Sequence, residues 1–114
     1  EQSLLIKELA EKSDCVIVGR SADYILRDKK PLRLFIYANI ESRMERCKKR
    51  APEQEHFTDK ELRRHILDID KKRGRYYQFF TGQNWGEKLN YDWCINTSDA
   101  DIEAVVDVIA RLLK

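Results

Sequence analysis

The stretch Leu34-Phe35-Ile36-Tyr37-Ala38 sets the expected fold of this chain. Apolar residues in an unbroken run, rich in aromatic and β-branched side chains, are typical of a strand covered on both faces, as in a parallel sheet. Asn39 ends the run and can cap a helix that has Glu41 in its first turn and continues toward Arg50. A buried strand followed directly by a helix is characteristic of α/β folds.

Two other stretches have the same character. Cys15-Val16-Ile17-Val18 is an apolar run stopped by Gly19, and Trp93-Cys94-Ile95-Asn96 is a third short run. With the helices expected around them, the order is helix, strand, strand, helix, helix, strand, helix. This order predicts an α/β fold of three layers, with a parallel sheet between flanking helices and ligands at the carboxyl ends of the strands.

The helices have clear sequence signals. Thr58-Asp59-Lys60-Glu61 is a capping box, and the helix that it starts is expected to run into Tyr76-Tyr77 despite Gly74. Ala51-Pro52 interrupts the preceding helix, and Ser98-Asp99-Ala100-Asp101 is expected to cap the last one. The apolar stripes of the two capped helices follow a helical period and comprise Leu62, Ile66 and Ile69, then Ile102, Val105, Val106, Ile109, Leu112 and Leu113.

Length and composition exclude several classes of protein. The 114 residues suit one domain, 11 aromatic residues argue against disorder, and no apolar run approaches the roughly 20 residues of a membrane span. No signal peptide is visible at Glu1. The cysteines Cys15, Cys47 and Cys94 lack a zinc or CxxC spacing, so we expect them to be buried in the core of a protein of the reducing cytoplasm. His56 and His65 belong to no recognisable nucleophilic triad.

Charge is unevenly distributed along the chain. The net charge is only +2, which argues against nucleic acid as a bulk partner. Residues 43–75, however, hold twelve of the 22 basic and seven of the 20 acidic residues, a local net charge of +5. This segment suits a small, multiply charged anion, and it suits a solvated helix face equally well.

Candidate site residues follow from position and spacing. Arg20 follows a predicted strand and Gly19, and its guanidinium matches phosphate or carboxylate oxygens. Arg43 and Arg46 are three apart, so one helix face could grip a polyanion with both. The pairing of Asp70 with Arg73 has two readings, which spacing alone leaves open. It is either a surface ion pair, or a carboxylate for ribose hydroxyls beside a guanidinium for phosphate.

In their order and spacing, these segments resemble the cytidylate kinase-like proteins of the nucleoside-monophosphate kinase group, which have the P-loop kinase fold. The similar segments are Cys15-Val-Ile-Val-Gly-Arg20, Leu34-Phe-Ile-Tyr-Ala38, Glu41-Ser-Arg43-Met-Glu-Arg46, Asp70-Lys-Lys-Arg73, Tyr76-Tyr77, Gly82-Gln-Asn-Trp-Gly86 and Cys94-Ile-Asn-Thr-Ser98. The resemblance implies transfer of the terminal phosphoryl group of ATP, with Mg²⁺, to CMP, dCMP or UMP. We expect no protein-bound metal and no membrane partner, and a homo-oligomer stays open. A nucleic-acid binder that uses residues 43–75 and the cluster of Tyr76, Tyr77, Phe79 and Phe80 is the weakest alternative, because the net charge is small.

The resemblance also implies residue roles. Arg43, Arg46 and Arg73 would be catalytic, closing over the transferring phosphates. The substrate-binding residues would be Arg20 and Asp23 on the acceptor side, Asp70 for the ribose and Arg73 for a phosphate. Well-studied cytidylate kinases read Gly-Arg-Asp, whereas Ser21 follows Arg20 here and Asp23 is the nearest acid. Ile66 replaces a further lid arginine of the family.

The Gly-rich loop that cradles ATP phosphates is absent from this sequence, whose four glycines, Gly19, Gly74, Gly82 and Gly86, are all isolated. We therefore expect residues 1–114 to be the C-terminal part of a single nucleotide-kinase-like domain, with a basic helical lid at about 40–78. On this reading the chain alone is inactive and its parent protein is the enzyme. The alternative is a catalytically inactive kinase-like module that binds a nucleotide or a protein.

Overall fold

The computed structural model describes residues 2–50 and 57–113. The elements in chain order, with η for a short 3₁₀ helix, are α1 (Gln2–Lys12), α2 (Ala22–Ile25), η1 (Arg27–Lys29), β1 (Leu34–Tyr37), α3 (Ile40–Arg50), α4 (Asp59–Thr81), η3 (Lys88–Asn90), β2 (Trp93–Asn96) and α5 (Ile102–Leu112). The predicted interruption at Ala51-Pro52 and the side chain of His56 lie outside the described residues.

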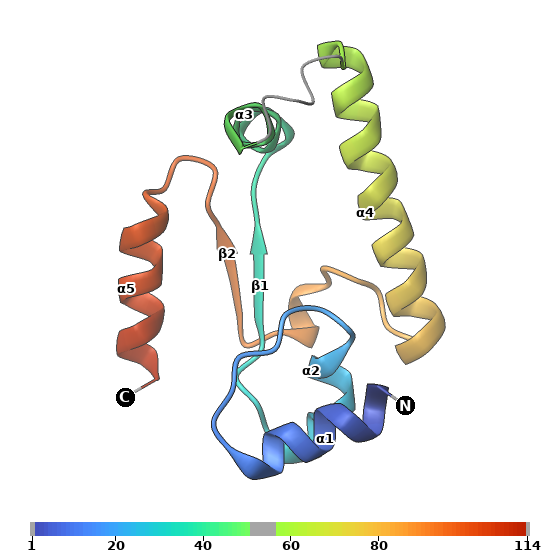
Figure 1. The fold of residues 1–114 in the computed structure, drawn as a ribbon, viewed down its shortest axis with the longest axis vertical. Helices are drawn as coiled ribbons and strands as arrows, with labels where there is room; N and C mark the ends of the chain where they lie inside the picture. The colour runs from blue at the N-terminus through green and yellow to red at the C-terminus, as the bar shows by residue number, and fades with distance from the viewer. Residues whose placement is uncertain (1, 51–56, 114) are drawn as a thin grey trace.

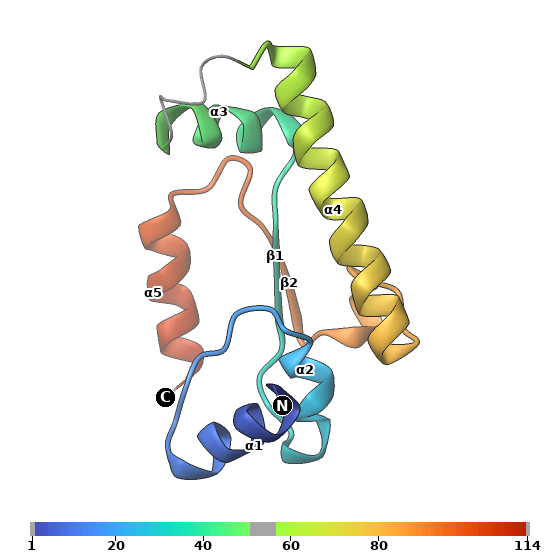
Figure 2. The ribbon, with the colours of Figure 1, turned by 45° about the vertical axis from the view of Figure 1, so that its right-hand side comes forward.

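The strands β1 and β2 form a parallel pair, with Leu34 opposite Trp93 and Tyr37 opposite Asn96. The parallel pairing expected of these two runs is therefore confirmed. Helices α5 and α4 lie on opposite sides of the strand pair in both ribbon views (Figures 1 and 2). The described chain is thus rich in helix around a small parallel sheet, which agrees with the expected α/β class at this coarse level.

The strand predicted at Cys15–Val18 is wrong for this structure. These residues have no regular secondary structure, and the side chains of Val16 and Val18 are each 87% exposed. Only Ile17 packs inward, against a small core of Ile6, Ala22, Ile25 and Leu26. The physical reason is that a strand exists only by pairing its backbone. Within the described ranges, β1 and β2 pair with each other and neither pairs with this run.

The expectation of buried cysteines is also wrong for two of the three. Cys15 lies in the unpaired run and is exposed, while Cys94 is exposed although it lies in β2. Cys47 is partly buried on α3. Burial of a strand residue depends on neighbouring elements, and neither position has the covering that the sequence pattern predicted.

The predicted caps of α3 and α4 are confirmed. The Asn39 side-chain oxygen accepts from the Ser42 amide at 2.8 Å at the start of α3. Thr58 Oγ1 accepts from the Glu61 amide at 3.1 Å, and the Glu61 carboxylate accepts from the Thr58 amide at 2.9 Å. Helix α4 continues through Gly74, where a Cβ would lie 3.8 Å from the Trp85 ring. A Cβ at this position would therefore be in ordinary contact with the indole.

Helix α5 forms as predicted, but only Val105 and Ile109 of its apolar stripe are partly buried. Asp101 caps the helix by accepting from the Glu103 amide. The side chains of Ile102, Val106 and Leu112 are nevertheless 48%, 57% and 40% exposed. Of the helices in the described ranges, none combines the length and the apolar character that spanning a bilayer requires.

Gly86 is expected to tolerate a side chain poorly. Its φ of +83° is left-handed, and an added Cβ would lie 3.2 Å from Cζ of Phe35, whose ring is also in contact with Trp85 and Tyr91. Gly82 is left-handed too, with φ +74°, but open space surrounds its Cβ position. Left-handed backbone alone should cost about 1 kcal/mol in either Ala variant.

We therefore predict that Gly86→Ala lowers the free energy of unfolding more than Gly82→Ala does, because only the first must also displace the Phe35 ring. Urea unfolding of the two variants measures the difference. Equal losses would show that the ring does not confine this turn.

Candidate functional site

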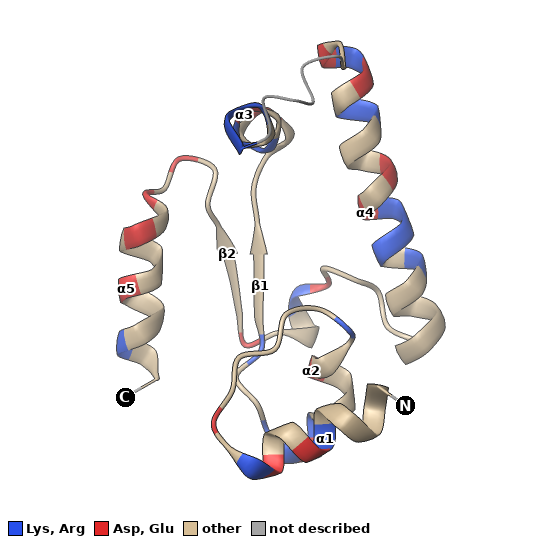
Figure 3. Ribbon diagram, in the orientation of Figure 1, with Lys and Arg blue, Asp and Glu red and all other residues tan. Residues whose placement is uncertain are grey.

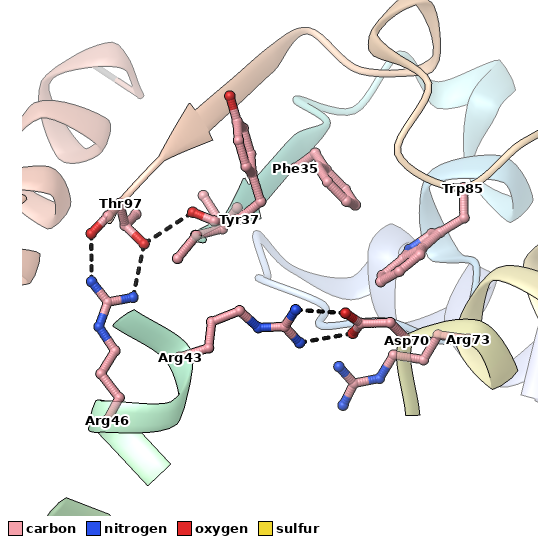
Figure 4. Close-up of a pocket in the computed structure, with 10 residues that line it drawn as sticks. Phe35, Tyr37, Arg43, Arg46, Asp70, Arg73, Trp85 and Thr97 are labelled. Atoms are coloured by element: carbon pink, nitrogen blue, oxygen red, sulfur yellow. Dashed lines mark hydrogen bonds and ion pairs between the residues drawn. The ribbon is translucent and has the colours of Figure 1, made fainter. Parts of the chain in front are cut away.

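A pocket of about 310 Å³ lies at the carboxyl ends of β1 and β2 (Figure 4). Its lining residues come from both strand ends, from α3 and α4, and from the loop before β2. They are Phe35, Ile36, Tyr37, Ala38, Arg43, Arg46, Asp70, Arg73, Trp85 and Thr97. The position matches the ligand site expected for a parallel sheet. It brings together four of the six predicted site residues.

Arg43 and Asp70 form a bidentate ion pair between α3 and α4. The two guanidinium nitrogens of Arg43 donate to the two carboxylate oxygens of Asp70 at 2.5 and 2.8 Å. The hydrogen bonds to Asp70 raise the pKa of the Arg43 guanidinium further, although partial burial opposes this. Such two-point pairs are stronger and more directional than single contacts. Asp70 is thus held by Arg43, and the surface ion pair with Arg73 that its spacing allowed does not form.

Arg46 is attached to the end of β2. Its guanidinium donates to the hydroxyl oxygen of Thr97 at 3.0 Å and to the carbonyl oxygen of the same residue. Thr97 is only 2% exposed, and its amide and hydroxyl both donate to the carbonyl oxygen of Tyr37. This set of bonds fixes α3 to the ends of both strands, and Thr97 is a residue whose role the sequence did not reveal.

Arg73 differs from the other two arginines. It lines the pocket beside Asp70, and no hydrogen bond or ion pair to another described residue occupies its guanidinium (Figure 4). Three arginines and one aspartate give the pocket a net charge of +2. Lys and Arg also gather along α3 and α4 outside the pocket, as Figure 3 shows. The arrangement can hold a small anion, with Arg73 as the cation that is free to receive it.

An aromatic group forms one wall of the pocket. The rings of Phe35 and Trp85 meet edge to face, with centroids 5.3 Å apart, and Tyr91 packs on Phe35 at 4.9 Å. The Gly86 amide donates to the hydroxyl of Tyr91 at 3.2 Å, which fixes the loop that carries Trp85. The sequence signalled only a turn with an aromatic anchor here. It did not reveal that the anchor faces the arginines.

The other two predicted site residues lie outside this pocket. Arg20 is exposed, in a turn where Gly19, Arg20 and Ser21 all have positive φ, at 70°, 62° and 54°. The Asp23 carboxylate accepts a hydrogen bond from the hydroxyl of Tyr77 at 2.7 Å. The structure therefore separates Arg20 and Asp23 from the arginine pocket and connects Asp23 to α4 through a tyrosine.

Tyr77 is buried, with 5% of its surface exposed. Burial is the main cause that raises the pKa of its phenol well above the usual value, and the hydrogen bond to the Asp23 carboxylate raises it further. Both effects favour the neutral phenol in the folded protein.

The fold and the pocket define a class of protein: a helix-rich α/β protein with an arginine-rich pocket at the carboxyl ends of parallel strands. Residues 1–99 match the family described as "Cytidylate kinase-like family". The chain belongs to this family, which confirms the resemblance seen in its sequence.

Two similar proteins illustrate the relationship. The chain is 31% identical over 111 residues to a cytidylate kinase of Archaeoglobus fulgidus, an alignment that covers 95% of this chain and 58% of that protein. It is also similar to the crystal structure of an uncharacterized protein from Eubacterium ventriosum, with a TM-score of 0.86 and 30% identity over 97% of this chain and 62% of that one. The chain thus spans about three fifths of the length of either protein.

Asp70 forms an ion pair with Arg43, so removal of the Asp70 charge should strengthen the binding of simple anions to the pocket. We predict that Asp70→Asn tightens the binding of inorganic pyrophosphate about fivefold, which corresponds to about 1 kcal/mol. Titration calorimetry at low salt measures the change. Asp68→Asn, an exposed neighbour outside this pocket, makes the same change in net charge and should have a smaller effect. Equal effects from both variants would mean that Asp70 does not restrain Arg43.

The raised pKa of Tyr77 predicts a loss of stability in alkali. Above pH about 10, the unfolded chain releases the phenolic proton while the folded chain keeps it, so the free energy of unfolding falls as pH rises. Tyr77→Phe should make this fall less steep, whereas Tyr76→Phe, which removes a phenol that is 51% exposed, should leave it unchanged. Urea unfolding between pH 8 and 11 provides the test. An unchanged slope in Tyr77→Phe would contradict the burial of a neutral phenol.

Proposed function

We propose that this chain is the C-terminal part of an ATP-dependent nucleoside-monophosphate kinase with the P-loop kinase fold. The whole protein transfers the terminal phosphoryl group of ATP to CMP, dCMP or UMP in this proposal. The observation that carries it is the convergence of Arg43, Arg46, Arg73 and Asp70 in one pocket at the carboxyl ends of parallel strands. Membership of the cytidylate kinase-like family supports the choice of substrates.

The residues of the pocket suit this chemistry. Phosphoryl transfer depends on positioning and on cations around the spreading negative charge, and it needs no nucleophilic side chain from the protein. Arg73 is ready to receive a phosphate. Arg43 would reach the phosphates by exchanging the Asp70 carboxylate for phosphate oxygens, and Asp70 would then accept hydrogen bonds from the ribose hydroxyls. Arg46 would hold its phosphate from the end of β2, where Thr97 positions it.

Helices α3 and α4 would act as the lid, at about residues 40–78. They are connected by the Arg43–Asp70 pair at the pocket and by an ion pair between Lys48 and Asp59 farther out. Closure of such a lid excludes water, which would otherwise accept the phosphoryl group.

The proposal treats the chain as one part of a domain. Its relatives are longer, most of the apolar stripe of α5 is exposed, and the apolar run Cys15–Val18 pairs with neither strand of residues 2–50 and 57–113. The remainder of the domain would supply the Gly-rich loop for the ATP phosphates. Within residues 2–50 and 57–113, no group of three His, Cys, Asp or Glu side chains is placed to hold a metal ion. Mg²⁺ would enter with ATP as part of the substrate.

A kinase assay on the natural, full-length protein tests the proposal. With ATP, Mg²⁺ and CMP, dCMP or UMP, we expect formation of the nucleoside diphosphate. Arg73→Ala should lower kcat/KM by about 100-fold or more, the usual loss when one cationic or hydrogen-bonding group at a developing charge is removed. Arg75→Ala, two residues farther along α4 and outside the pocket, should keep wild-type activity.

The alternative function gives a different result in the same experiment. A full-length protein that binds ATP and a nucleoside monophosphate in calorimetry, but forms no diphosphate, would be an inactive binding module. A protein that binds neither nucleotide would contradict the kinase proposal and leave only a module that binds another protein. Equal losses in Arg73→Ala and Arg75→Ala would show that the arginine pocket is not the site of transfer.

A further inference from the structure

The turn that carries Arg20 has an unusual backbone. Gly19, Arg20 and Ser21 are consecutive residues with left-handed φ, and two of them have side chains that disfavour this conformation. Such a turn persists only when its surroundings hold it. Locally, the Ser21 carbonyl oxygen accepts from the amides of Tyr24 and Ile25 at 3.0 Å each, which connects the turn to α2.

The interior of this turn is also unusual. Ser21 is 6% exposed, and its hydroxyl has no hydrogen-bond partner among the described residues. A buried hydroxyl without a partner makes no contribution to holding the turn and is costly in itself. Backbone hydrogen bonds hold the turn locally, and the Asp23 carboxylate, two residues farther along, adds a side-chain anchor to another element.

Asp23 is held by α4. The Tyr77 hydroxyl donates to its carboxylate at 2.7 Å across 54 positions of sequence. The Oε1 atom of Gln83 lies 3.0 Å from the same hydroxyl and is a second acceptor for its one proton, and the Asp23 carboxylate is the nearer of the two. Because the Tyr77 side chain is buried, its hydroxyl is held in one place.

Tyr77 shares α4 with two residues of the pocket. It lies four residues after Arg73 and seven after Asp70, so all three are on one face of the helix. One rigid element therefore carries a carboxylate and a guanidinium in the pocket and, two turns along, the hydroxyl that holds Asp23. A contact at one end of this face fixes the turn of Arg20 relative to the pocket at the other end.

We propose that Tyr77 is a positioning residue that acts through Asp23 to hold the left-handed turn at Gly19–Ser21. The turn thereby fixes the position of Arg20 relative to Asp70 and Arg73. This inference rests on the proposed role of Arg20 as a ligand of the acceptor nucleotide. It gives Asp23 a different role from the one expected from sequence: the carboxylate supports the turn and does not itself contact the acceptor.

The test compares two tyrosines of α4 in the full-length protein. Tyr77→Phe removes only the hydroxyl that holds Asp23, and Tyr76→Phe removes an exposed hydroxyl one residue away. We expect Tyr77→Phe to raise the KM for the acceptor about threefold to tenfold, the effect of one lost hydrogen bond, and to change kcat less than twofold. Amide hydrogen exchange at residues 19–26 should become faster. The control should change neither quantity.

A second pair of variants separates positioning from a merely structural effect. In an Arg20→Ala background, Tyr77→Phe should cause no further rise in the KM, because the residue that it positions is already gone. Asp23→Ala removes the acceptor of the Tyr77 hydrogen bond, so it should reproduce the effect of Tyr77→Phe, and it serves as the test if that variant folds poorly. Additive losses in the Arg20→Ala background would overturn the proposal.

Failure of the positioning role can be told apart from failure of the proposed function. If the protein binds no nucleoside monophosphate, the proposed function fails, while exchange at residues 19–26 still tests whether Tyr77 holds the turn. Unchanged exchange in Tyr77→Phe would overturn the positioning role even in an active kinase. Equal changes in Tyr76→Phe and Tyr77→Phe would overturn it as well.

Discussion

Parallel pairing of β1 with β2 is the constraint on which the rest of this structure depends. Parallel strands run in the same direction, so the chain must leave the carboxyl end of β1 and return to the start of β2 by a long crossover. Helices α3 and α4 are that crossover, and α3 begins at the strand ends (Figure 1). The hydrogen bonds of Thr97 to Tyr37 and of Arg46 to Thr97 then fix the start of the crossover in place. The arginines of the crossover therefore gather at one edge of the sheet.

Protein groups already engage most of the positive charge of the pocket. Two of its three arginines are engaged by protein groups, Arg43 by a carboxylate and Arg46 by a neutral threonine, and Arg73 is left to meet an anion. An anion with one phosphate can use Arg73 without disturbing the fold. A ligand that also brings hydroxyl donors for Asp70 compensates that carboxylate for the loss of Arg43. The proposed function therefore implies a preference for a phosphorylated sugar or nucleotide over a simple anion of equal charge.

Local signals in the sequence predicted the features that are local in physical origin. Asn39 and Thr58 cap their helices with bonds to residues three positions away, and the apolar runs of β1 and β2 pair as expected. The strand prediction for Cys15–Val18 is wrong because an apolar composition indicates what a strand would bury. It does not indicate whether a partner strand is available for pairing. The Tyr77–Asp23 bond and the Trp85 wall escaped prediction because they join positions that only the tertiary fold brings together. Four of the six predicted site residues meet in the pocket: helix spacing put Arg43 with Arg46 and Asp70 with Arg73, and the family resemblance selected both pairs as site residues.

The central claim is that the arginines at the strand ends receive the phosphates of a nucleotide. Nuclear magnetic resonance of the arginine side-chain N–H groups in the full-length protein tests it most directly, during titration with CMP and a non-hydrolysable ATP analogue. The account predicts saturable shifts for Arg43 and Arg73, with Arg43 losing the signature of its Asp70 partner, while Arg75 stays unchanged. Saturable nucleotide binding that leaves the Arg43 and Arg73 signals unmoved would contradict it.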